Sequence, residues 1–218
     1  MVATNSTIPG LPDAVTVTPS YSLAASDGAG LDVELPVTVL RKYTNAGIRS
    51  FPILAQAMSP SVVGGCAALA RIATSANHPD IASLDFDATT QEFAQFACTM
   101  PKDWDRGTIT ATFKWSHSAT TINFGVKWGI QAVAVGDGDS IDAAYGTAQE
   151  VADTGGATNV KYWTQATSAL TVAGSPQAED TIYFRFYRLP SDSADNLAVD
   201  ARLEEVKIYY TTNAADEA

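Results

Sequence analysis

The chain of 218 residues has 24 acidic but only 13 basic side chains, and its formal net charge of −11 argues against two broad classes of partner. Binding of nucleic acid through its phosphates and docking on anionic lipid both need clustered lysine and arginine, which are scarce here. Hydrophobic residues make up 46% of the chain, so it can bury a core, and its length suits one large all-β domain with an extension.

The first thirty residues are polar and are repeatedly interrupted by proline and glycine. Pro9, Pro12 and Pro19, with Gly28 and Gly30, work against any helix or long strand. We expect this segment to be disordered, or to be an extended arm that is ordered by a partner. The N-terminus lacks the basic region and apolar run of a signal peptide, and no stretch approaches a transmembrane span. The expectation is a soluble protein made in a cytoplasm.

Residues 31–80 give mixed signals. Leu31–Leu40 alternates between apolar and polar residues and predicts a strand, which Pro36 restricts to a sheet edge or a bulge. Phe51–Met58 is a short apolar run. Cys66–Ser75 has helical composition, and either a short helix or an irregular strand fits it. We therefore expect residues 1–80 to form an N-terminal arm and a small irregular or β region.

The clearest pattern covers residues 107–135. Apolar residues, among them Phe113 and Trp115, alternate with polar ones up to residue 117, and the alternation resumes with Phe124 and Trp128. This pattern predicts two long strands joined as a hairpin by the polar connector 118–121, with both apolar faces buried. The register places Trp115 and Trp128 in the core.

Further strands follow at regular spacing through the rest of the chain. The last of them needs a bulge to keep Leu203 inside. A helical turn is expected at Asp142–Gly146, and a helical turn or a loop at Ser191–Ala201. Strands separated by Gly, Pro and Asp turns predict an all-β fold, an antiparallel β-sandwich or jelly roll, over residues 81–218. The additional strands are Ile81–Phe86, Phe93–Met100, Thr147–Val151, Val160–Ser168, Thr181–Arg188 and Arg202–Thr211.

The sequence gives only weak signals for a metal site or for a reactive thiol. Cys66 and Cys98 are the only cysteines, and we interpret them as free thiols that pack as small apolar groups. Asp137, Asp139 and Asp142 offer oxygen atoms to Ca²⁺, but their spacing is not that of an EF-hand, and a capped turn explains the same residues. We favour the turn and predict neither a metal site nor a cofactor.

Catalytic chemistry is not favoured either. His78 and His117 lie far apart, and neither has cysteine or carboxylate neighbours at metal-ligand spacing. Glycoside hydrolysis needs two carboxyl groups that face each other across a groove, whereas Asp- and Ser-rich connectors ordinarily form capped turns. We expect no catalytic residue and no enzyme. The carboxylates weighed for hydrolysis are Asp180, Asp192, Asp195 and Asp200.

Aromatic side chains are better candidates for contact with a partner. Trp104 lies in a predicted turn, and Tyr183 and Tyr187 share one face of a predicted strand. Exposed aromatic rings can stack on sugars, and aromatic residues are also enriched in the cores of subunit interfaces. Together with the loop carboxylates of Asp137 and Asp139, these three aromatics are the candidate contacts for a protein partner or a glycan.

Nine passages from residue 84 onward resemble a β-sandwich module of uncharacterised structural proteins of tailed bacteriophages and prophages. The resemblance is one of pattern over roughly the last six-tenths of the chain, and it brings no catalytic residues. The passages are Leu84–Asp87, Phe93–Phe96, Met100–Asp105, Gly107–Ala111, Trp128–Gln131, Tyr145–Gln149, Ala173–Pro176, Tyr183–Arg188 and Asp195–Leu203.

This resemblance implies a virion component and a symmetric oligomer, with a homotrimer expected. The first hypothesis is a capsid decoration (cement) or head-fibre protein, made in the host cytoplasm and located on the capsid exterior. Its partners would be the major capsid protein, other virion proteins and further copies of itself. The alternative is a tail-fibre or receptor-binding module that recognises a host-surface glycan, and a polysaccharide hydrolase is a third, less favoured class.

Overall fold

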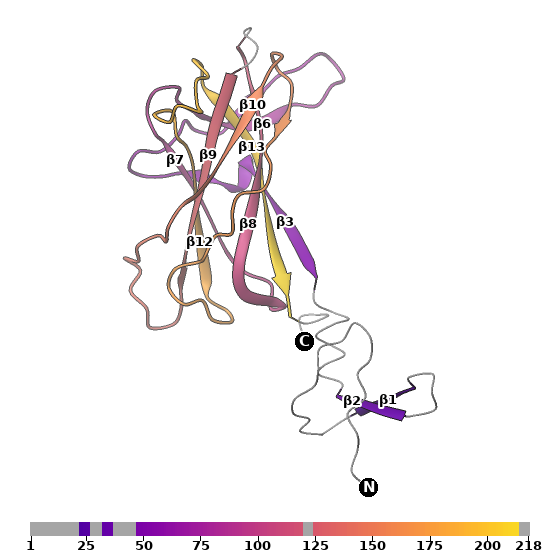
Figure 1. Cartoon of the computed structure of the whole chain (residues 1–218). Helices are drawn as coiled ribbons and strands as arrows, with labels where there is room; N and C mark the ends of the chain where they lie inside the picture. The colour runs from indigo at the N-terminus through magenta and orange to yellow at the C-terminus, as the bar shows by residue number, and fades with distance from the viewer. Residues whose placement is uncertain (1–21, 27–31, 37–46, 120–123, 214–218) are drawn as a thin grey trace.

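The computed structural model describes residues 22–26, 32–36, 47–119 and 124–213 (Figure 1). In these ranges the chain is almost entirely β-structure, with one short 3₁₀ helix, η1 (Ala55–Ala57). β1 (Ser22–Ser26) and β2 (Asp32–Pro36) form a two-stranded antiparallel sheet, and β2 falls within the strand predicted at residues 31–40. The rest of the predicted arm and part of the connector 118–121 lie outside the described residues. None of the described segments is a helix long and apolar enough to cross a membrane.

Two antiparallel sheets enclose the core, as the predicted β-sandwich requires. The five-stranded sheet has the order β10 (Gln149–Gly155), β9 (Phe124–Val135), β12 (Thr181–Arg188), β7 (Phe93–Thr99) and β4 (Ser59–Pro60). The six-stranded sheet contains β11 (Tyr162–Trp163), β8 (Trp104–His117), β13 (Ala201–Thr212), β6 (Ile81–Phe86) and β5 (Ala70–Ile72), with β3 (Ile48–Leu54) also paired to β13.

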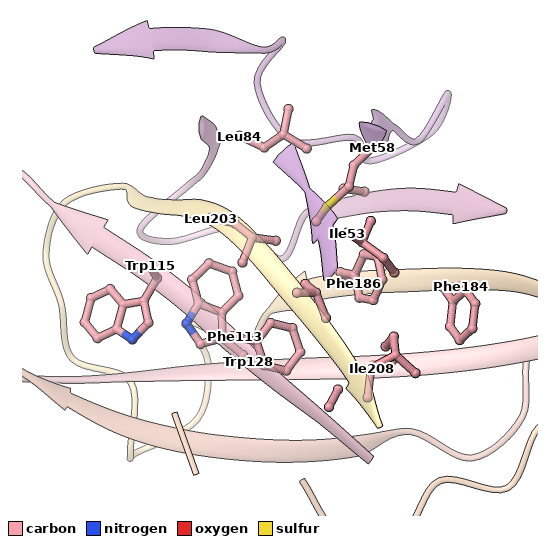
Figure 2. Packing of buried hydrophobic residues seen from close by; sticks show 14 of the residues in the cluster. Ile53, Met58, Leu84, Phe113, Trp115, Trp128, Phe184, Phe186, Leu203 and Ile208 are labelled. Carbon is pink, nitrogen blue, oxygen red and sulfur yellow. The ribbon is translucent and has the colours of Figure 1, made fainter. Parts of the chain in front are cut away.

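The two long strands predicted at residues 107–135 form, but the predicted hairpin is wrong. β8 pairs with β13 and β11, whereas β9 pairs with β12 and β10, so the two strands lie in opposite sheets. Their apolar faces meet across the core, where Phe113 stacks on Trp128 with ring centroids 5.7 Å apart and planes at 10° (Figure 2). Alternation determines which side of a strand is apolar, but it does not determine which strand is its hydrogen-bonded neighbour. Two strands that face each other from opposite sheets bury their apolar sides just as two paired strands of one sheet do.

β13 is the central strand of the six-stranded sheet. One side of it pairs with β8, and the other side pairs first with β6 and then with β3. A register shift between Leu203 and Glu205 is the bulge that the sequence required. Leu203 is thereby kept in the core, and the extra residue, Glu204, forms an ion pair of 2.6 Å with Lys161.

Strands from before residue 81 also take part in the two sheets. β3, β4 and β5 pair with β13, β7 and β6, so the sheets draw on chain from both sides of the predicted boundary at residue 80. The helix weighed for Cys66–Ser75 is wrong and the irregular strand is correct, because the amide of Cys66 donates to the carbonyl of Phe93 across the sheet. The helical turn expected at Asp142–Gly146 is also absent: the segment has no helical residue, and the amide of Gly146 donates to the carbonyl of Ala132 on β9 at 3.3 Å. The division into two domains stays a prediction.

Arg188, at the end of β12, fastens the loop of residues 189–200 to the sandwich. The side chain is fully buried, and its guanidinium donates to both carboxylate oxygens of Asp195, at 2.9 and 2.7 Å. A buried charge is tolerated when it is paired and hydrogen-bonded in this way. The remaining acceptors are the carbonyl oxygens of Phe86, Asp87, Leu197 and Val199.

Candidate functional site

The outward face of the five-stranded sheet carries a group of aromatic side chains around one arginine. β12 contributes Tyr183, Arg185 and Tyr187, because residues two apart on a strand share a face. β7 contributes Phe93, and the loop before β10 contributes Tyr145. We call these five side chains the platform.

Arg185 stands between two aromatic rings. Its guanidinium carbon lies 4.5 Å from the ring centroid of Phe93 and 4.5 Å from that of Tyr145, which are cation–π distances. Nε and Nη2 donate to Oε1 of Gln131, at 3.1 and 2.5 Å. The Gln131 side chain is itself fixed, since its Nε2 donates to the carbonyl oxygen of Gly146 at 2.8 Å. The arginine is therefore held in place, and its hydrogen-bond acceptor is a neutral amide.

Tyr187 is the buried aromatic residue of the platform. Its ring lies over Gly129 so closely that a Cβ there would be 2.1 Å from the tyrosine Cζ, and its centroid is 5.8 Å from that of Phe93. The hydroxyl donates to Glu150 at 2.8 Å. Burial, followed by the hydrogen bond to Glu150 and its charge, raises the pKa of Tyr187. At 3% exposure Tyr187 is not available as the contact residue that was expected from the sequence.

An ion-pair network borders the platform beside Tyr187. The Lys127 ammonium lies 2.6 Å from the carboxylate of Asp192 and 2.9 Å from that of Glu150. These bonds, the one to Asp192 first, raise the pKa of Lys127, and the bond from Lys127 is the main cause that lowers the pKa of Asp192. The Lys127 amide also donates to Asp195 at 3.0 Å, which ties the network to Arg188. Lys127 is thus already neutralised.

Tyr183 is the exposed aromatic ring of the platform. Its side chain is 38% exposed, whereas Phe93 and Tyr145 are half-buried. Ala97 lies beside it on β7, and this small, exposed residue leaves the ring open to solvent. Burial raises the pKa of Tyr145, and the charge of Arg185 opposes this effect. The outward position predicted for Tyr183 is confirmed.

The other candidate contacts lie away from the platform. The exposure expected for Trp104 from a turn is wrong: the residue begins β8, pairs with Thr212 and is 4% exposed. Asp137 and Asp139 are exposed in the loop after β9, where Asp139 accepts the amide of Gly136 at 2.9 Å as a turn residue does. Within the described ranges, no group of three or more His, Cys, Asp or Glu residues is arranged to hold a metal ion.

The four aspartates weighed for hydrolysis are engaged separately. Asp195 and Asp192 belong to the two ion pairs described above. Asp180 accepts the amide of Gln177 at 2.7 Å in the turn before β12, and Asp200 is exposed just before β13. These positions do not bring two carboxylates together across a groove.

The thiols are free, as predicted, and His117 is a core residue. Burial raises the pKa of Cys66 to about 12 and that of Cys98 to about 11. His117 is fully buried, with ring centroids of Phe124 and Tyr162 at 4.4 and 5.7 Å. Burial, and then the nearby charge of an arginine, lower its pKa.

Sequence reasoning missed Arg185, Phe93 and Tyr145 as members of a site. The alternation of β12 was a usable signal for Arg185, because it placed this residue on the same face as Tyr183. Nothing local indicated Phe93 and Tyr145, since they come from separate segments that meet only in the folded sheet.

No protein-family model matches the chain, and no curated protein matches it. Among solved structures, it is similar to the CBM22-2 xylan-binding domain from Paenibacillus barcinonensis, with 9% identity and a TM-score of 0.42 over 73% of this chain and 98% of that one. It is also similar to CBM28, a non-crystalline cellulose-specific carbohydrate-binding module, with 10% identity and a TM-score of 0.39 over 75% of this chain and 89% of that one.

A further likeness is to a chain in the structure of infectious bursal disease virus strain Gx, with 10% identity and a TM-score of 0.37. It covers 90% of this chain but only 38% of the viral one. At these identities and TM-scores the likenesses carry no argument about function. The assignment of the fold rests on the strand pairings described above.

Proposed function

We propose that the chain is a non-catalytic binding module that recognises saccharide through the platform. The observation that carries this proposal is the open ring of Tyr183 beside the fixed guanidinium of Arg185. A pyranose presents an apolar C–H face and a rim of hydroxyl groups. An aromatic ring can pack against the face, and a guanidinium can donate hydrogen bonds to the rim.

The setting of these side chains suits recognition. Three of the five platform residues stand on β12, a strand in the middle of the five-stranded sheet, so their spacing is fixed by the backbone ladder. From Tyr183 to Arg185 the strand rises by about 7 Å, so a sugar that packs on the Tyr183 ring can reach the guanidinium with its hydroxyl groups.

Retention on a glycan array tests the proposal. Tyr183→Ala should weaken binding by a factor between about 2 and about 13, the range expected for one lost ring contact of roughly 0.5–1.5 kcal/mol. Trp163→Ala is the matched control, because Trp163 is 65% exposed on the other sheet. Failure of the native chain to retain any saccharide would refute the proposal, as would equal effects of the two substitutions.

A second candidate is a structural role in a bacteriophage virion, and the exposed apolar edge of the six-stranded sheet favours it. Within the described ranges β3 pairs only with β13, so one side of this strand is open, and Ile48 and Leu54 on it are 76% and 43% exposed. The cross-strand register Leu54, Glu205, Lys114, Trp163 places Trp163 on the same outward face. Open strand edges and exposed apolar residues are features of surfaces that pair with another chain.

In this role the chain would be a homotrimeric decoration or head-fibre protein on the capsid exterior, made in the host cytoplasm. The phage resemblance from residue 84 to the end of the chain supports it. We expect the chain to sediment as a trimer and to bind expanded capsids, raising their melting temperature. Ile48→Ser combined with Leu54→Ser should release monomers and leave saccharide retention unchanged. If the native chain is monomeric and does not bind capsids, this second candidate is refuted and saccharide binding is unaffected.

A further inference from the structure

We propose that the saccharide is acidic and that its carboxylate pairs with Nη1 of Arg185. This inference rests on saccharide binding by the platform. The rings of Phe93 and Tyr145 each have their centroid 4.5 Å from the guanidinium carbon, and Nε and Nη2 both donate to Gln131. No hydrogen bond or ion pair between described residues uses Nη1 of Arg185. Two N–H groups of this nitrogen are left for a ligand.

Among the described residues, no carboxylate forms an ion pair with Arg185. Two other cations of the five-stranded sheet are neutralised, Arg188 by Asp195, and Lys127 by Asp192 and Glu150. In a chain of net charge −11, the guanidinium of Arg185 instead faces the neutral amide of Gln131. An oxyanion is the group that both the charge and the planar N–H donors of arginine prefer.

The neighbouring ring selects a saccharide carboxylate among oxyanions. Tyr183 and Arg185 are two residues apart on one strand face, which separates them by about 7 Å. A sugar stacked on Tyr183 can therefore bring its own carboxylate, or that of the next sugar, to Nη1. A phosphate- or sulfate-rich polymer needs many cations, and Arg185 is the one un-neutralised cation of the platform.

The test uses the full chain and an array of saccharides that carry glucuronic, galacturonic or sialic acid, each beside its carboxyl-reduced form. We expect the acidic members to bind at least tenfold more tightly, and this preference to shrink as salt is raised from 50 to 500 mM. Arg185→Gln should abolish the preference, because it should weaken the acidic members far more than their reduced forms, whereas Tyr183→Ala should weaken both forms by the same factor. Arg71→Gln, at an exposed arginine on β5, is the matched control.

Gln131→Glu is a second variant, which tests whether the preference depends on the charge of Arg185 rather than on the packing of the rings around it. It keeps the size of the side chain and places a carboxylate against Arg185, so it should suppress acid preference while the arginine remains. Equal binding of acidic and reduced forms would overturn the inference and leave saccharide binding intact. Stronger capture of polyglutamate than of any acidic saccharide would overturn it in favour of an acidic protein. Retention of no saccharide at all would refute both proposals.

Discussion

Replacement of Arg188 by methionine should destabilise the sandwich more than any surface substitution. The guanidinium makes six hydrogen bonds, and the partner carboxylate of Asp195 is only 1% exposed. Methionine fills much of the volume but leaves a buried carboxylate without a cation and several carbonyl oxygens without donors. Removal of one partner of a buried ion pair costs about 3–5 kcal/mol, a large share of the roughly 5–15 kcal/mol that stabilises a domain.

Urea unfolding measures this loss. With an m-value of about 2 kcal/mol/M, a loss of 4 kcal/mol lowers the midpoint by about 2 M. Arg71→Met, at an exposed position on β5, should change the free energy of unfolding by no more than about 0.5 kcal/mol. Asp195→Asn in the Arg188→Met background should recover part of the loss, because no charge then remains buried. A loss below about 1 kcal/mol for Arg188→Met would refute the claim that this pair holds the loop.

Three further outcomes follow from local features. Gly129→Ala forces a Cβ into the ring of Tyr187 and should lower the free energy of unfolding by about 1–3 kcal/mol. Gly47→Ala, where a Cβ meets no atom within 4 Å, should leave it unchanged. Equal stabilities of the two variants in thermal melts would contradict this. Cys66 and Cys98, with pKa values raised to about 12 and about 11, should expose thiolate fractions of roughly 10⁻⁴ and 10⁻³ at pH 8, so a disulfide reagent should modify them far faster in urea than in the native state. Hydrogen bonds from the Thr89 hydroxyl, and then from backbone amides, lower the pKa of Asp87 from 3.8 to about 2. The stabilising contribution of this carboxylate is therefore complete above pH 3.8 and is lost as the pH falls through about 2. An NMR titration of Asp87 with a midpoint near 4 would contradict this.

Local pattern was sufficient to predict which side of each strand is buried. Trp115 and Trp128 are fully buried as their register required, and the bulge after Leu203 lies where the alternation breaks. These features depend on residues a few positions apart. The pairing of strands depends on segments far apart in the chain, and alternation contains no information about it. This is why β8 and β9, adjacent in sequence, were expected as a hairpin but face each other across the core.

The candidate site shows the same limit. The outward position of Tyr183 could be read from β12 alone. The burial of Tyr187 could not, because it depends on the missing side chain of Gly129 on the next strand. Trp104 was expected in a turn, and its burial follows from the pairing of β8 with the end of β13. The sequence thus predicted which residues of one strand share an outward face, but not which residues of different strands lie together.

The first and last strands of the sandwich meet at one pole. β3 and the end of β13 lie side by side there (Figure 1), and Ile48 pairs with Thr211. The Gly47 amide donates to the Thr212 hydroxyl at 3.1 Å, and the Thr212 amide donates to the Gly47 carbonyl at 2.9 Å. A mechanical load applied between these two ends would separate β3 from β13 one ladder pair at a time, beginning at this pole. The five-stranded sheet, with the platform on its outer face, would lie outside the line of force, so a tethered molecule could be pulled without deforming the platform.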